Sequence, residues 1–88
     1  MINIEVTKKF RKQVFELQKK RRKQLFDRLR IFCLDPYDQT LKTHPLKGNL
    51  SGIHSFSVTG DLRVHFKWED KEKTEVLILQ IGTHSQLY

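Results

Sequence analysis

The spacing of the apolar residues changes near the middle of the chain, and this change constrains the fold more than any other feature. In residues 10–33 apolar side chains recur every three or four positions, the period of an amphipathic helix. In residues 62–68 apolar and polar side chains alternate, the period of a half-buried strand. A chain that changes period in this way predicts helices packed against a sheet. The polar residues of the alternating strand, which are expected to face away from the core, are Arg63, His65 and Lys67.

Local signals set the expected boundaries of the elements. Residues 2–6 predict a short first strand, and Thr7 stands where the N-cap of a helix belongs. Asp35-Pro36 is expected to end the second helix, because proline disfavours helical geometry in the residue before it. Residues 35–49 are expected to form an ordered loop, followed by strands around 53–58, 62–68 and 75–82. The predicted order β-α-α-β-β-β is a single α+β domain over residues 1–88, with a helical hairpin on one face of a largely antiparallel sheet.

Positive charge is concentrated in the first third of the chain. Residues 1–30 carry 11 Lys and Arg against 3 acidic residues, and residues 31–88 carry 6 against 7. The net charge of +7 therefore comes entirely from the predicted helices, which is typical of a nucleic-acid or acidic-protein partner, unless this is only a solvated face. The candidate RNA-binding residues, including two later lysines, are Lys8, Lys9, Arg11, Lys12, Lys19, Lys20, Arg21, Arg22, Lys23, Lys47 and Lys67.

Other features restrict the class of protein. A single cysteine, Cys33, cannot form an internal disulfide and fits a reducing cytoplasm. The longest apolar run, "VLILQI", is strand-sized, so neither a membrane span nor a signal peptide is expected. No cofactor is expected, since there is no glycine-rich phosphate loop. The histidines at 44, 54, 65 and 84 lack the tight pair spacing of a zinc site, and only a scattered three-histidine site stays open.

Several polar residues at strand ends could meet on the open face of the sheet. Arg63 and Lys67 are expected to point away from the core, and Asp61 begins their strand. His44 lies in the loop before the sheet, and His84 follows the last strand. Together such groups suit metal-free RNA cleavage, in which an imidazole takes the 2′-OH proton and an arginine stabilises the phosphorane. The alternatives are a cross-strand ion pair for Arg63 and a frayed tail for His84.

Two segments resemble a known family. "HPLKGNLSGIHSFSVTGDLRVHF" and "ILQIGTHSQLY" resemble the RelE superfamily of bacterial type II toxins, and the YafQ-like branch in particular. Its members show H-P-L-x-G, a G-x-x-x-x-x-V segment, an Asp-led strand and G-[TS]-H-x-x-L-[FY], and the match covers nearly all of residues 44–88. The resemblance implies an mRNA endonuclease that acts in the ribosomal A site, without metal, by 2′-OH attack. It also implies contacts with ribosomal RNA and an antitoxin partner.

The resemblance assigns candidate catalytic residues one by one. His44 matches the histidine of H-P-L-x-G, Asp61 matches the acid that begins the third strand, and His84 matches the catalytic histidine of G-[TS]-H. Tyr88 stands where the branch has an aromatic residue that stacks on or positions a base, so it could act through its ring or its phenol. Arg63 stands where RelE-like toxins carry an arginine.

Two serines depart from the YafQ-like pattern. Ser55 and Ser57 occupy places where that branch often has Asp and His, and a serine is no ionised base at neutral pH. Either Arg63 replaces the lost pair or the nuclease is weaker. Two other functions stay open. One is a non-catalytic relative, such as a ParE-like gyrase poison or a degenerate toxin that binds antitoxin, and the other is a plain RNA-binding domain.

Overall fold

The computed structural model describes residues 2–88, and its strands form one sheet with the order β1-β5-β4-β3-β2. The elements are β1 (Asn3–Val6), α1 (Lys8–Glu16), α2 (Lys19–Leu34), η1 (Gln39–Leu41), β2 (His44–Pro45), η2 (Gly48–Leu50), β3 (His54–Ser57), β4 (Leu62–Trp68), β5 (Glu75–Thr83) and α3 (His84–Leu87), where η marks a 3-10 helix. β1 pairs with β5 in parallel, and every other neighbouring pair is antiparallel. The predicted α+β class with a largely antiparallel sheet is confirmed.

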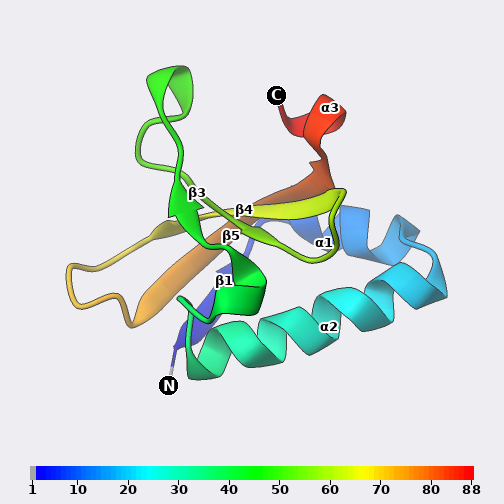
Figure 1. The fold of residues 1–88 in the computed structure, drawn as a ribbon, viewed down its shortest axis with the longest axis horizontal. Helices are drawn as coiled ribbons and strands as arrows, with labels where there is room; N and C mark the ends of the chain where they lie inside the picture. Colours follow the sequence, from blue (N-terminus) through cyan, green and yellow to red (C-terminus); the bar gives the residue numbers. More distant parts are fainter. Residues whose placement is uncertain (1) are drawn as a thin grey trace.

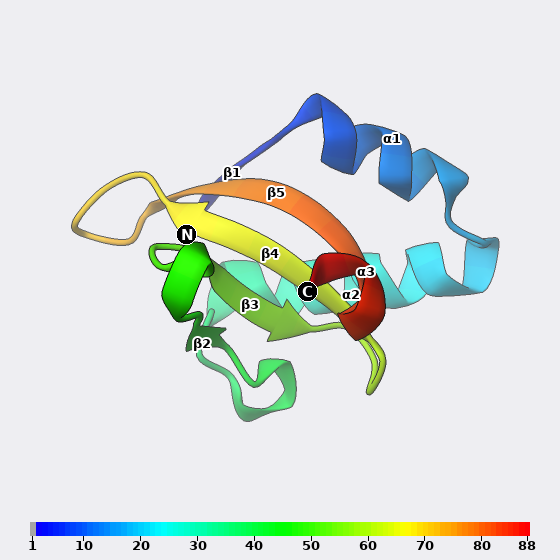
Figure 2. The ribbon, with the colours of Figure 1, turned by 90° about the horizontal axis from the view of Figure 1, so that it is seen from above.

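The helices lie in layers around the sheet. α2 crosses one face, α1 packs beside β5, and α3 rises from the opposite face together with the segment that holds β2 and η2 (Figure 1). Seen from above, β5, β4, β3 and β2 follow one another across the sheet with α2 behind them (Figure 2). The face opposite α2 therefore carries both α3 and the segment that holds β2 and η2.

The ends of the helices follow the predicted signals. The Thr7 hydroxyl accepts a hydrogen bond from the Phe10 amide at 3.0 Å and so caps α1. The same hydroxyl donates to the Leu79 carbonyl at 2.7 Å, which ties the start of α1 to β5. α2 ends at Leu34, directly before Asp35-Pro36. Among residues 2–88 no helix combines the length and the apolar character that a membrane crossing requires.

An aromatic cluster holds α2 against the sheet. The Phe32 ring lies 4.9 Å from the ring centroid of Phe56, 5.0 Å from that of Phe66 and 6.0 Å from that of Trp68. Phe32, Phe56 and Phe66 are fully buried, and burial of each such ring contributes about 1.5–3 kcal/mol. This packing fixes which face of β4 belongs to the core. Of the four apolar residues of this strand that were expected to face inward, Leu62, Val64 and Phe66 are buried and Trp68 is partly buried.

Four short elements were missing from the predicted order. The expected loop at 35–49 contains η1 and the edge strand β2, and η2 begins within it. Its Leu41 is fully buried and anchors the segment on the core. β5 is also followed by α3, a single helical turn. Neither a strand of two residues nor one helical turn is long enough to show a period in the sequence.

Candidate active site

Strand pairing brings polar residues into two rows on the sheet face opposite α2. Residues directly opposite one another on neighbouring strands share a face of the sheet. One row crosses β2, β3, β4 and β5 and consists of His44, Ser55, His65 and Gln80. The adjacent row consists of Ser57, Arg63 and Gly82. The predicted outward direction of Arg63 and His65 is thus correct for the face.

Four of the five predicted catalytic residues line one pocket on this face. The pocket has a volume of about 300 Å³ and is lined by His44, Leu46, Arg63, His84 and Tyr88. They come from β2, the segment after it, β4 and α3, so the pocket depends on the tertiary fold. In the sheet, β4 lies between β3, which pairs with β2, and β5, which leads into α3. Arg63 on β4 therefore stands between the β2 side and the α3 side of the pocket.

α3 is built to hold His84 and Tyr88 over the sheet. The Thr83 amide donates to the Gln86 side chain at 2.8 Å, and the Gln86 amide donates to the Thr83 hydroxyl, which forms a capping box. A Cβ at Gly82 would come within 3.0 Å of the Gln86 side chain, so the missing side chain lets α3 approach β5 closely. The ring centroids of His84 and Tyr88 lie 4.6 Å apart. The predicted end segment is therefore docked, and it is not frayed.

His65 is fully buried, contrary to the expectation that it faces solvent. It lies on the predicted face, but the last residue of the chain covers it. The Nε2 atom of His65 is 3.0 Å from the Tyr88 hydroxyl oxygen, and the two rings meet edge to face with centroids 5.2 Å apart. Tyr88 itself stays 49% exposed.

A chain of hydrogen bonds fixes which ring nitrogen of His65 carries the proton. The Lys9 ammonium donates to the Gln80 side-chain oxygen at 2.8 Å, and an ammonium can only donate. The amide NH₂ of Gln80 therefore points at His65 Nδ1, at 3.3 Å, and Nδ1 must accept. Nε2 then holds the proton of the neutral ring and donates it to the Tyr88 oxygen. The Tyr88 hydroxyl hydrogen stays available to the pocket.

The electrostatic surroundings also favour the neutral ring of His65. Burial lowers its pKa below the usual 6.5, and electrostatic interactions with His44 and Arg63 lower it further. Both of these residues line the same pocket. His65 is thus held as a neutral hydrogen-bond donor at neutral pH.

His44 has a fixed tautomer as well. Its Nδ1 atom is 2.9 Å from the Lys42 carbonyl oxygen, and a carbonyl can only accept, so Nδ1 carries a proton. In the neutral ring Nε2 is then the basic atom. His44 is exposed at the edge of the sheet, where a substrate can reach it. This arrangement suits a general base.

The two serines that depart from the YafQ-like pattern lie beside the pocket on the same face of the sheet. Ser57 pairs in register with Arg63, and its hydroxyl accepts from the Arg63 guanidinium at 3.4 Å. Ser55 is fully buried between His44 and His65 in its row, and its hydroxyl has no protein partner.

Asp61 is not brought into the pocket. It is exposed in the turn between β3 and β4, and its backbone amide donates to the Thr59 hydroxyl at 3.3 Å. The next residue, Leu62, pairs with Thr83, so Asp61 lies at the same end of the sheet as His84 without lining the site. Asp61 is close to other candidate residues in the sequence motif, but it does not share their cavity.

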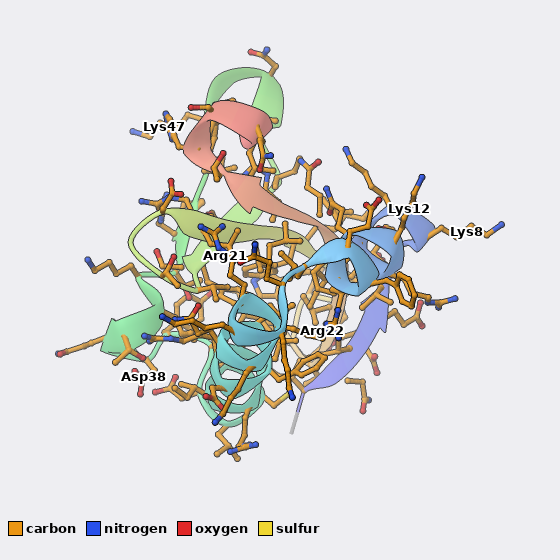
Figure 3. All side chains as sticks on the ribbon, turned by 90° about the vertical axis from the view of Figure 1, so that its right-hand side faces the viewer. Lys8, Lys12, Arg21, Arg22, Asp38 and Lys47 are labelled. Carbon is orange, nitrogen blue, oxygen red and sulfur yellow. The ribbon has the colours of Figure 1, made fainter. Side chains whose placement is uncertain are left out.

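Most of the predicted RNA-binding residues are exposed. Lys8 and Lys12 project from α1 into solvent at the right of Figure 3. Lys47 lies at the upper left of the same view. Lys9 is engaged with Gln80, and Arg21 is half-buried. The exposed members of the predicted set are Lys8, Arg11, Lys12, Lys19, Lys20, Lys23, Lys47 and Lys67, to which the exposed but hydrogen-bonded Lys9 is added.

Arg22, one of the predicted RNA-binding residues, makes contacts within the protein. Its guanidinium donates to the carbonyls of Val14, Phe15 and Leu17 at 3.3, 3.0 and 2.9 Å. These carbonyls lie at the end of α1, where a helix leaves its last acceptors without partners. Arg22 thus joins α2 to the end of α1, and a basic run in the sequence could not distinguish this residue from its neighbours.

His65 and Gln80 are the residues that the sequence did not reveal as part of the site. In the sequence pattern both are ordinary strand positions, and only the return of Tyr88 over β4 gives them a role. No group of three or more His, Cys, Asp or Glu side chains that could hold a metal ion occurs within residues 2–88.

Several solved structures have a similar fold. YafQ from E. coli strain BL21(DE3) superposes with a TM-score of 0.79 at 24% identity, over 100% of this chain and 99% of the other. A metal-bound toxin from Helicobacter pylori gives a TM-score of 0.74 at 26% identity over the whole of both chains. The archaeal RelE-RelB complex from Pyrococcus horikoshii OT3 gives 0.76 at 17% identity, over 97% of each chain.

Sequence comparison alone finds no relative, since no protein-family model and no curated protein sequence matches the chain significantly. The structural matches are nevertheless close over nearly the full length of each partner. Residues 2–88 therefore have the fold of the RelE superfamily of toxins, and YafQ is among the structures that share it.

Proposed function

We propose that this protein is the toxin of a type II toxin-antitoxin system and that it cleaves mRNA on the ribosome. The observation that carries the proposal is the pocket that brings His44, Arg63, His84 and Tyr88 together from three parts of the chain. Two imidazoles, a guanidinium and a phenol supply a base, an acid and charge stabilisation for attack of a 2′-OH on the adjacent phosphorus.

The roles follow from the geometry of each group. His44, whose Nδ1 proton is held by the Lys42 carbonyl, takes the 2′-OH proton on Nε2. The 2′ oxygen then bonds to phosphorus, and Arg63 stabilises the charge on the phosphorane. His84, as the imidazolium, gives a proton to the 5′ oxygen as the P–O5′ bond breaks. The products are a cyclic phosphate and a free 5′-OH, and the two histidines have exchanged protonation states.

Tyr88 completes the site in a fixed orientation. The neutral His65 ring donates to its oxygen, so the phenol presents its O–H to the pocket and can bond a phosphate oxygen. The ring also stands beside His84, with centroids 4.6 Å apart, and its exposed side can stack on a base. In this proposal His65 is a positioning residue, because it acts on the substrate only through Tyr88.

The basic residues of the helices serve a different contact. α1 and α2 do not contribute to the pocket, which lies on the sheet face opposite α2. A short mRNA in the pocket would leave most of the helical lysines free, whereas ribosomal RNA around an A site can reach both surfaces. Phosphate contacts of this kind weaken as salt rises. The charge therefore supports a cytoplasmic, ribosome-bound enzyme.

An antitoxin is the proposed protein partner. Two of the similar structures are toxin complexes, the archaeal RelE-RelB complex and the YoeB-YefM complex from Staphylococcus aureus. The excess positive charge of residues 1–30 suits an acidic or amphipathic antitoxin segment on the helices or over the pocket.

One observation keeps a second function in view. No acidic side chain lines the pocket, and the positions of the missing Asp and His are taken by the buried Ser55 and Ser57. A relative that has lost catalysis could poison gyrase, or could survive as an antitoxin-binding module.

Induction in bacteria separates these functions. The nuclease is expected to arrest growth and to leave transcripts in discrete fragments, detected by probing defined mRNAs soon after induction. A gyrase poison would leave transcripts intact and accumulate cleaved DNA bound to gyrase. An inert binder would neither arrest growth nor damage either nucleic acid.

A further inference from the structure

A second cavity lies beside the proposed active site and carries three cationic side chains. It has a volume of about 300 Å³ and is lined by Arg28 from α2, Lys42 after η1, Arg63 from β4 and the hydroxyl residues Thr40, Ser57 and Thr59, with Val58 and Gly60. No acidic residue belongs to its lining. Three positive charges around one cavity repel one another, and an anion within the cavity would relieve that repulsion.

The protein neutralises the positive charges of this cavity only in part. Arg28 donates one N–H to the Thr40 carbonyl at 3.3 Å and keeps its other donors. Asp38, a carboxylate on which the charge of Arg28 acts, is occupied by the Thr40 hydroxyl and amide at 2.7 and 2.9 Å. Those bonds, helped by the charge of Arg28, hold the pKa of Asp38 below its usual value. Asp38 therefore stays ionised and, from outside the cavity, offsets part of the positive charge of Arg28.

Two hydroxyls of the cavity are left as donors. The Thr59 oxygen already accepts from the amides of Asp61 and Leu62 at 3.3 and 3.0 Å, so its O–H is free to donate. The Ser57 oxygen likewise accepts from Arg63. The Thr40 hydroxyl, in contrast, is spent on Asp38. Guanidinium groups, an ammonium and O–H donors are the groups that bind phosphate oxygens.

The cavity is joined to the active site at two points. Arg63 lines both cavities. Lys42, in the left-handed region with φ of 51°, presents its carbonyl to His44 of the active site at 2.9 Å and also lines the second cavity. A strand that places one phosphate at Arg63 and His44 would therefore bring a neighbouring phosphate to Arg28 and Lys42.

From this we infer that the cavity between Arg28, Lys42 and Arg63 is a subsite for the RNA phosphate next to the one that is cleaved. The inference rests on the proposed function, which it extends by naming how the substrate strand is held. Binding of the second phosphate would also set the register of the strand, and so the bond presented to His44.

The test uses short RNAs that bind and cannot be cut. A 2′-O-methyl dinucleotide with its single internal phosphate is compared with the same molecule carrying an added 5′-phosphate or an added 3′-phosphate. Affinities are measured by NMR titration of the full chain, for the native protein and for Arg28→Gln, Lys42→Gln and Lys71→Gln. The Lys71 variant removes the same charge from the exposed turn at the far end of β4.

One added phosphate is expected to tighten binding by about tenfold, the size of a charge-assisted contact. Arg28→Gln and Lys42→Gln should each lose most of this gain, and Lys71→Gln should keep it. Equal gains in all four proteins, or no gain in the native protein, would overturn the subsite. Resonance shifts of Arg28 and Lys42 with a polyglutamate peptide but not with the added phosphate would assign the cavity to a protein carboxylate and would also overturn it.

The outcome does not depend on catalysis, so the two proposals can fail separately. A protein that cuts no RNA but loses the phosphate gain on Arg28→Gln refutes the nuclease and retains the subsite. A protein that cuts mRNA while its Arg28 and Lys42 variants bind like Lys71→Gln retains the nuclease and loses the subsite. Two variants on different elements guard against a folding defect in one of them.

Discussion

The imidazole of His65 and the phenol of Tyr88 meet at 3.0 Å, and this hydrogen bond attaches the last turn of the chain to the middle of β4. His65 is fully buried, while Tyr88 is about half-exposed. The pair therefore joins a rigid strand to a residue that can touch a substrate. Its orientation is set from α1, because Lys9 aligns Gln80 and Gln80 aligns the His65 ring.

Replacement of His65 by leucine should weaken catalysis while the fold persists. Leucine keeps the volume within the buried site but cannot donate to Tyr88, and one such hydrogen bond corresponds to about tenfold in rate. His65→Gln, which can still donate through its amide, should recover part of the loss. Cleavage of a defined mRNA in a translation system measures both variants.

A second measurement separates positioning from mere packing. Nitrogen shifts of the His65 ring should show a neutral ring protonated at Nε2, and residues 84–88 should become more mobile in His65→Leu. A ring protonated at Nδ1, or a rigid tail in the leucine variant, would contradict the proposed role of His65.

Tyr88→Phe tests whether the phenol matters beyond the ring. The phenylalanine can still stack against His84 and a base, but it leaves the buried Nε2–H of His65 without its acceptor. The free energy of unfolding should fall by about 1–3 kcal/mol, and cleavage should fall by about tenfold. Denaturant titration and primer extension give the two values. Unchanged cleavage with the expected loss of stability would reduce Tyr88 to a stacking ring.

The stability of the protein should depend on pH through His65. Burial lowers its pKa in the folded state, so the unfolded chain binds a proton at a higher pH than the folded one. The free energy of unfolding should therefore decrease as pH falls below about 6.5, by at most about 1.4 kcal/mol per pH unit for one proton. Above that pH this contribution is constant.

Denaturant titrations between pH 8 and pH 5 check the prediction, with His65→Leu beside the native protein. The variant should show a shallower decrease. Some slope should persist, since burial and the charges of Lys73 and His44 also lower the pKa of His54. Identical slopes in the two proteins would show that His65 titrates as it does in the unfolded chain.

Arg22 and Lys23 are neighbours in the sequence and should behave differently. Arg22→Gln loses most of the bonds to the end of α1 and should lower the free energy of unfolding by about 1.5–3 kcal/mol. Lys23→Gln removes the same charge from an exposed position and should leave stability unchanged. If both variants are equally stable, the guanidinium contacts contribute nothing measurable.

Much of the fold could be predicted from the sequence because its long elements have clear periods. The alternation of β4, the N-cap at Thr7 and the stop at Asp35-Pro36 all lie within a few residues of where they act. β2 and α3 were not predicted because each spans only about one period of its pattern, which is too short for the period to be recognised. Their positions depend on distant anchors, such as the buried Leu41 and the contact between His65 and Tyr88.

The sequence predicts which residues belong to the site better than it predicts the contacts among them. His44, Arg63, His84 and Tyr88 were chosen as candidates, and the structure places them around one pocket. Asp61 was chosen on the same grounds and lies outside, because the turn after β3 turns it to solvent. Alternation gave His65 the correct face and the wrong exposure, since no local signal shows which residue returns to cover a strand.

The most direct test of the account is to map 5′ ends by primer extension after adding the protein to a purified translation system with a defined mRNA. His44→Ala, His84→Ala and the matched histidine variant His54→Gln, which lies outside the pocket, are run alongside the native protein. The account predicts cuts at fixed codon positions that require ribosomes, that persist in His54→Gln and that disappear in the other two. Cuts that remain in folded His44→Ala and His84→Ala, or a native protein that leaves the message intact, would contradict it.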